Sequence, residues 1–114
     1  MRVLVANQPR SYREAIARVL VQARPHLETI TCDPALLAES VRLLAPDLVV
    51  CSAVDEELAE RAGSWVELYP EGRALARISI HGRLSQVEDP DLAGMLSVVD
   101  AVASEPSRRA GSAI

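Results

Sequence analysis

The sequence predicts a single α/β domain in which a doubly wound, mostly parallel sheet is covered by helices on both faces, making three layers. Two observations lead to this prediction. Short apolar runs alternate with amphipathic segments from the first residues onward, and this alternation is typical of βαβ units with right-handed crossovers. The connections between the segments are only a few residues long, which favours successive elements that pack side by side.

The composition is that of one ordinary globular domain. The chain has 114 residues, of which 49% are hydrophobic and 25% charged, a balance that supports one buried core. Aromatic residues make up 3% and phenylalanine is absent, so we expect a core of leucine, valine, isoleucine and alanine. The net charge of −4 gives no reason to expect nucleic-acid binding, which relies on clustered positive charge.

The first strand and helix are predicted from adjacent patterns. Residues 2–6, RVLVA, are apolar without alternation, as in strands that are buried on both faces. A helix follows, and its start is indicated by Ser11 and Glu14, which have the spacing of a capping box. Pro25 ends this helix.

A second strand, a second helix and a third strand come next. Residues 27–32 alternate between apolar and polar positions, which suits an edge strand. Asp33 and Pro34 predict the N-cap and first turn of the second helix, which ends before Pro46. Residues 47–52, DLVVCS, are again a buried strand.

A third helix is predicted over residues 55–69, with Asp55 as its N-cap. Its mainly apolar face consists of Leu58, Ala62, Trp65, Val66 and Tyr69. Residues 74–80, ALARISI, then predict a fourth strand. This strand alternates, and the face that carries Arg77 and Ser79 should be partly solvated.

The chain is expected to end with one more helix and a flexible tail. Residues 91–103 are apolar over most of a helical circumference. The small and polar residues 104–114 predict the tail, so the domain itself is expected to span residues 1–103.

Ligands of parallel α/β sheets bind at the carboxyl ends of the strands. The residues at those positions are Asn7 and Gln8, Cys32 and Asp33, Cys51 and Ser52, and His81 after the predicted fourth strand. None of these loops has the glycine spacing of a phosphate-binding or dinucleotide-binding loop.

Three segments resemble the receiver domain of bacterial two-component response regulators. The stretch RVLVANQPRSYREAIARVL is similar to the opening of a receiver, and APDLVVCSAV to the segment that ends in the phosphorylated aspartate. DPDLAGMLSVV is similar to the last receiver helix. The resemblance covers residues 1–60 well and residues 88–103 in outline. It implies a flavodoxin-like fold with the strand order 2-1-3-4.

The resemblance also implies that the chemistry of a receiver has been lost. The acidic pair that binds Mg²⁺ corresponds to Asn7 and Gln8, whose neutral amides lack the anionic oxygens that this cation prefers. The phosphoacceptor corresponds to Ser52, and the switch hydroxyl after the fourth strand to Ser79 or His81.

The receiver's lysine is missing too, since this chain contains no lysine, and Gln86 is the residue nearest its place. Phosphoryl transfer depends on a cluster of charges around the transferred group. We therefore expect a pseudo-receiver that takes no phosphate and is not an enzyme.

A receiver has more chain between its fourth strand and its last helix. Residues 81–88 leave room for a short fifth strand at most, so we expect that strand to be short or absent and the receiver's fourth helix to be deleted. The deletion would uncover an apolar rim on the last helix, and a homodimer is the simplest cover. The candidate interface residues are Leu92, Met95, Leu96 and Val99.

Cys51 is a candidate reactive thiol. The chain shows no export signal, and two cysteines in such a chain indicate reduced thiols in a cytoplasm. The acidic residues that begin at Asp55 would raise the pKa of Cys51, so we expect it to act as a small buried hydrophobic residue. Cys32 and Cys51 end strands on either side of the first strand, and we expect no disulfide between them.

The sequence thus favours a cytoplasmic regulatory domain that acts in signalling by binding a protein, whose identity the sequence leaves open. One alternative is a sensor that binds a small molecule at the carboxyl ends of the strands. Another is an enzyme or redox protein that uses Cys51 with Ser52 or His81. We expect no cofactor, no structural zinc, no nucleic-acid partner and no membrane partner.

Overall fold

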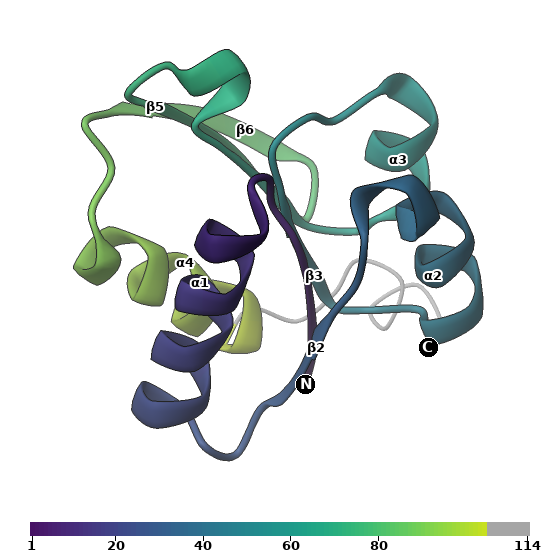
Figure 1. Ribbon diagram of the computed structural model, residues 1–114, viewed down its shortest axis with the longest axis horizontal. Helices are drawn as coiled ribbons and strands as arrows, with labels where there is room; N and C mark the ends of the chain where they lie inside the picture. The colour runs from purple at the N-terminus through teal and green to yellow at the C-terminus, as the bar shows by residue number, and fades with distance from the viewer. Residues whose placement is uncertain (105–114) are drawn as a thin grey trace.

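The protein has an α/β fold with a six-stranded mixed sheet, and the computed structural model describes residues 1–104 (Figure 1). The order of the strands across the sheet is β2-β1-β3-β4-β5-β6. The strands are β1 Arg2–Ala6, β2 Glu28–Thr31, β3 Leu48–Cys51, β4 Trp65–Leu68, β5 Leu75–Ile80 and β6 Arg83–Glu88. The α-helices in this part of the chain are α1 Arg10–Ala23, α2 Leu37–Leu44, α3 Glu56–Arg61 and α4 Leu92–Ser104. Two short 3₁₀ turns, η1 Pro34–Leu36 and η2 Pro70–Gly72, complete the connections.

The first four strands form the parallel part of the sheet. β1 pairs in parallel with β2 and with β3, and β3 pairs in parallel with β4. All four residues of β3 are buried, and so are the last four of β1. The apolar runs without alternation therefore predicted central strands correctly, because both faces of these strands are covered.

Helices cover both faces of this parallel part (Figure 1). On one face, α1 and α4 bury Leu20 and Val99 against Val50 and its neighbours. On the other face, the cluster beneath α2 and α3 buries Val41 and Leu58. Neighbouring residues of β1 and β3 point alternately into the two cores, as the pleat of a strand requires.

Of the three predicted helix caps, one is present as predicted and a second is displaced. The carboxylate of Asp55 accepts a hydrogen bond from the N–H of Leu58 at 2.8 Å at the start of α3. The carboxylate of Asp33 accepts one from the N–H of Ala35 at 2.8 Å, but it caps the 3₁₀ turn η1, and α2 begins only at Leu37 without a side-chain cap. The capping box at Ser11 is wrong, because α1 already begins at Arg10 with Pro9 at the N-cap position. Glu14 instead accepts a hydrogen bond from Nε of Arg10 at 2.8 Å on the exposed side of the helix.

The prediction of one long helix over residues 55–69 is also wrong. Helix α3 ends at Arg61, and after a short turn residues 65–68 form β4. The apolar positions of this segment fit a helical repeat, but Trp65 and Val66 point to opposite faces of the sheet and are both buried. Insertion between β3 and β5 favours the strand, because it pairs the backbone on both sides.

The last two strands form a hairpin that the sequence interpretation missed. β5, the strand predicted as the fourth, is the fifth strand and runs antiparallel to β4. It turns through His81 and Gly82, both at positive φ, into β6, which spans six residues where a short or absent strand was expected. The sheet is therefore mixed and not purely parallel. Between β4 and β5 the chain forms only η2.

Helix α4 agrees with its prediction to within one residue, since it extends from Leu92 to Ser104. Met95 and Val99 are buried in the chain's own core, whereas Leu92 is exposed and Leu96 is partly buried. Two of the four candidate interface residues are therefore enclosed within the chain. Apart from Ser104, the predicted tail lies outside the described residues.

Candidate functional site

The residues that follow β1 and β3 form a small hydrogen-bonded cluster. Asn7 Nδ2 donates to the hydroxyl oxygen of Ser52 and to the carbonyl of Leu68, each at 3.4 Å. The N–H of Gln8 donates to Ser52 Oγ at 2.8 Å, and the Ser52 hydroxyl donates back to the Gln8 carbonyl at 3.3 Å. The structure thus brings together Asn7, Gln8 and Ser52, and the cluster joins the ends of β1, β3 and β4.

Asn7 is the most enclosed member of the cluster, with 0% of its surface exposed. Its Oδ1 atom is buried and has no hydrogen-bond partner among the described residues. An ionised carboxylate at this position would face the Leu68 carbonyl in a dry environment, where a charge without a counter-ion is strongly unfavourable. The neutral amide is therefore the side chain that this packing tolerates.

The Ser52 hydroxyl serves a structural purpose in this arrangement. It accepts hydrogen bonds from Gln8 and Asn7 and donates one to Gln8, so its donor and both acceptor sites are used. A serine nucleophile needs an adjacent general base, and all the contacts of this hydroxyl are to amide groups. Ser52 therefore fixes the loop after β1 to the end of β3.

Ser79, His81 and Gln86 do not join this cluster. Because β5 is antiparallel, Ser79 is paired with Trp65 at the beginning of β4, and the His81 N–H donates to Ser64 at 3.0 Å. Both residues therefore lie beside the amino-terminal end of β4, whereas Asn7 lies at the carboxyl ends of the parallel strands. Gln86 lies in β6, two strands away from β4.

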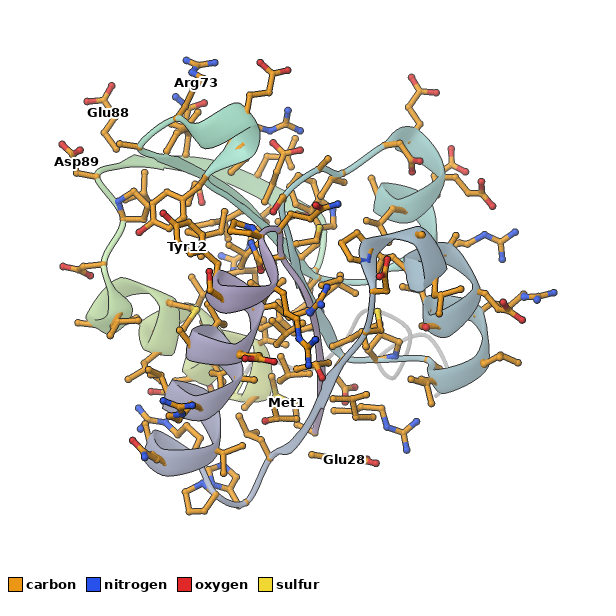
Figure 2. All side chains as sticks on the ribbon, viewed as in Figure 1. Met1, Tyr12, Glu28, Arg73, Glu88 and Asp89 are labelled. Carbon is orange, nitrogen blue, oxygen red and sulfur yellow. The ribbon has the colours of Figure 1, made fainter. Side chains whose placement is uncertain are left out.

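Tyr69 occupies the position directly after β4 that was assigned to Ser79 or His81. Its ring contacts the ring of Tyr12 edge to face, with centroids 5.9 Å apart, and its hydroxyl donates to the carbonyl of Pro90 at 3.3 Å. Figure 2 shows Tyr12 reaching from the first turn of α1 toward this region. Tyr69 therefore connects the first turn of α1 to the segment that precedes α4.

Cys51 lies on the other face of the sheet, in the core beneath α2 and α3. Burial raises the pKa of its thiol to about 12, and the negative charges of Glu67 and Asp55 act in the same direction. The thiol is therefore protonated at neutral pH and lies 3.5 Å from the Ala53 carbonyl. A protonated, enclosed thiol is a poor nucleophile, which disfavours chemistry at Cys51. Burial also raises the pKa of Cys32.

Glu67 is a buried carboxylate that the sequence interpretation did not identify. It accepts a hydrogen bond from the N–H of Val54 at 2.8 Å and forms an ion pair with Arg77 at 3.5 Å across β4 and β5. The Arg77 guanidinium also lies over the ring of Trp65, 5.6 Å from its centroid. The β-rich stretch WVEL was the available signal, because in a strand its glutamate must face one of the sheet's two covered sides.

An apolar cavity of about 310 Å³ lies between the sheet and the first turns of α4. Val66, Leu68, Ile78, Met95 and Val98 contribute to its lining, and Glu88, Asp89 and Asp91 lie around it. The lining does not include Asn7, Gln8 or Ser52. This cavity is therefore separate from the cluster at the strand ends.

Within residues 1–104, no group of three or more histidine, cysteine or acidic side chains is placed to hold a metal ion. In the same part of the chain, no helix is both long and apolar enough to cross a bilayer. Comparisons with protein-family models, curated proteins and solved structures give no significant match.

Proposed function

We propose that this protein is a regulatory domain with a receiver-like architecture that takes no phosphate and acts by binding another protein. The proposal includes a three-layer, flavodoxin-like ancestry for the part of the chain that ends with β4. The observation that supports it most is the cluster of Asn7, Gln8 and Ser52 at the strand ends. These are the positions of the metal-binding pair and the phosphoacceptor in the receiver that the sequence resembles.

The physical state of the cluster supports the loss of phosphate chemistry. Asn7 is enclosed, Ser52 has its hydrogen-bonding capacity filled by amide groups, and neither side chain carries a charge. Mg²⁺ requires anionic oxygen ligands, and the transferred phosphoryl group requires compensating positive charge. The cluster supplies neither, and its hydrogen bonds suit a fixed structural element.

The first test is incubation with acetyl phosphate and Mg²⁺, followed by intact mass spectrometry. The expected result is no mass increase, while a phosphorylatable receiver treated in parallel gains one phosphate. The matched control is Ser52→Ala, which removes the only hydroxyl at the phosphoacceptor position. An adduct on the wild-type protein that disappears in this variant would contradict the proposal.

The binding half of the proposal has its own test. A lysate of the source cells is passed over the immobilised protein with and without acetyl phosphate and Mg²⁺. We expect the same specific partner in equal amounts under both conditions. A partner retained only in the presence of acetyl phosphate would show that the domain still responds to phosphate.

A second candidate function, sensing of a small apolar molecule, is favoured by the cavity beneath α4. Its lining is mainly aliphatic, and its volume is within the range of ligand pockets. Ala76 lies in this lining, so Ala76→Leu should fill part of the space. A ligand that raises the melting temperature of the wild type but not of Ala76→Leu would favour the sensor. A broad metabolite screen without any shift would count against it.

A further inference from the structure

The outer edge of β6 has no neighbouring strand within the part of the chain that the structure describes. All six residues of β6 are exposed, although its pairing with β5 is regular from Arg83 to Glu88. Sheet edges are usually protected from further pairing by prolines, bulges, central charges or short length. β6 has no proline and no bulge, and its central residues 84–87 are uncharged.

The register of the hairpin shows which backbone groups are available. The N–H of Asp89 donates to the Ala74 carbonyl at 3.0 Å, which continues the ladder between β5 and β6. In an antiparallel pair the residues that bond to a given neighbour alternate along the strand. The odd-numbered residues of β6 therefore bond to β5. The N–H and C=O groups of Leu84, Gln86 and Glu88 point away from the sheet.

We infer that β6 pairs with β6 of a second copy of this chain, in an antiparallel arrangement whose two-fold axis passes through Gln86. In this register Gln86 lies opposite Gln86 of the second copy, and Leu84 lies opposite its Glu88. Three bonded pairs, each exchanging two hydrogen bonds, make six intermolecular bonds. The two sheets then form one continuous sheet of twelve strands.

Neighbouring registers leave more of the outward-pointing backbone N–H and C=O groups without a hydrogen-bond partner. A shift of two residues in one direction places Glu88 opposite Gly82, which belongs to the hairpin turn. The same shift in the other direction places Leu84 opposite Pro90, which has no N–H to donate. A shift of one residue places the outward-pointing backbone groups of one copy opposite residues whose backbone groups already bond to β5, so the hydrogen bonds between the copies cannot form.

Charge complementarity favours the same register. It places Arg83 of each copy opposite Asp89 of the other, on the same face of the joined sheet. Figure 2 shows the carboxylates of Glu88 and Asp89 at the end of β6, pointing away from the body of the molecule. The exposed side chain of Val87 lies opposite Ser85 of the second copy and loses contact with water there.

The other edge of the sheet fits this arrangement less well. β2 has four residues against six in β6. Its first residue, Glu28, is held by an ion pair with Arg2 of β1 at 2.8 Å. A shorter edge offers fewer backbone groups to a second chain. β6 is thus the better site of self-association.

The test compares Gln86→Pro with Gln86→Ala by sedimentation equilibrium over a range of protein concentrations. Proline removes the outward N–H of residue 86 without removing a bond to β5, and proline is accepted at such edge positions. Each dimer then loses two hydrogen bonds, so its dissociation constant should rise about 30-fold. Gln86→Ala keeps the N–H and should dimerise like the wild type.

Amide hydrogen exchange on the wild type tests the same contact without any substitution. At high concentration the amides of Leu84, Gln86 and Glu88 should exchange slowly, and dilution should make all three exchange faster. The amide of Val87, bonded to β5, should change much less.

A monomer at all concentrations, or a dimer that Gln86→Pro leaves intact, would overturn this inference. Neither result would affect the proposed regulatory function, which depends on the absence of phosphate chemistry and on binding a different protein.

Discussion

The two parts of the sheet follow different structural rules. The parallel part, β2-β1-β3-β4, encloses β1 and β3 between helices and is connected through crossovers. The hairpin of β5 and β6 is connected by a turn of two residues, and its outer strand is exposed throughout. The arrangement of the parallel part is therefore determined by the burial of its strands, and that of the hairpin by the local geometry of its turn. The hydrogen-bonded cluster of Asn7, Gln8 and Ser52 lies at the ends of the parallel strands, and the edge that we propose for a second chain lies in the hairpin.

The largest difference should appear when one leucine is shortened in each part. Leu4 in β1 is 0% exposed and Leu84 in β6 is 74% exposed. Leu4→Ala should lower the free energy of unfolding by about 3 kcal/mol, because it leaves a cavity in a packed core. Leu84→Ala should change it by less than about 0.5 kcal/mol. Urea denaturation at low protein concentration measures both, and equal losses would contradict the comparison.

A change of intermediate size in the free energy of unfolding should come from the titration of Cys51, the buried thiol of the parallel part. The pKa of Cys51 rises from 9.0 to about 12 on folding, so the unfolded chain loses this proton first as the pH increases. Titration of this thiol therefore leaves the free energy of unfolding unchanged below pH 9 and lowers it between pH 9 and pH 12. From pH 8 to pH 10 the free energy of unfolding of the wild type should fall by about 1 to 2 kcal/mol more than that of Cys51→Val.

Urea denaturation at the two pH values gives this difference directly. The variant serves as the control, because it removes the thiol and keeps an apolar side chain at the site. The same loss in both proteins would mean that Cys51 is not the group responsible.

The smallest of the three expected differences in stability should come from a substitution in the hairpin turn, and it should be confined to the hairpin. Gly82 has φ of 90°, and a methyl group added at its Cα would have no neighbour within 4 Å, so Gly82→Ala introduces backbone strain without a clash. The expected loss is about 1 kcal/mol. Amides of β6 should exchange faster, while those of β1 and β3 keep their rates. His81→Asn is the matched control, because asparagine suits the positive φ of that turn position.

The sequence predicted the parallel part better than the hairpin, for a physical reason. Strands buried on both faces leave a direct signal in RVLVA and DLVVCS, and Asp33 and Asp55 each make a local capping bond that sequence alone reveals. The segment from 62 to 69 has helical spacing of apolar residues, and only its partners β3 and β5 make it a strand. Tertiary pairing decides such short ambiguous runs.

The sequence also carries a signal for the hairpin. ALARISI and RLSQVE are both compatible with strands, and the two residues between them, His81 and Gly82, have the length of the commonest hairpin turn. At the candidate site, Asn7, Gln8 and Ser52 were identified because they follow strands directly. Ser79, His81 and Gln86 were misplaced since their positions depended on counting β5 as the fourth strand. Glu67 was missed because it was assigned to a helix.

The position of Trp65 gives the protein an internal optical reporter. It is the single tryptophan of the chain, it is 4% exposed, and its strand β4 is the strand of the parallel part that borders the hairpin. If the hairpin detaches, the indole loses its contact with Arg77 and meets water on that side only. Complete unfolding instead exposes the whole ring. Intrinsic fluorescence can thus separate local opening from global denaturation in the unlabelled protein.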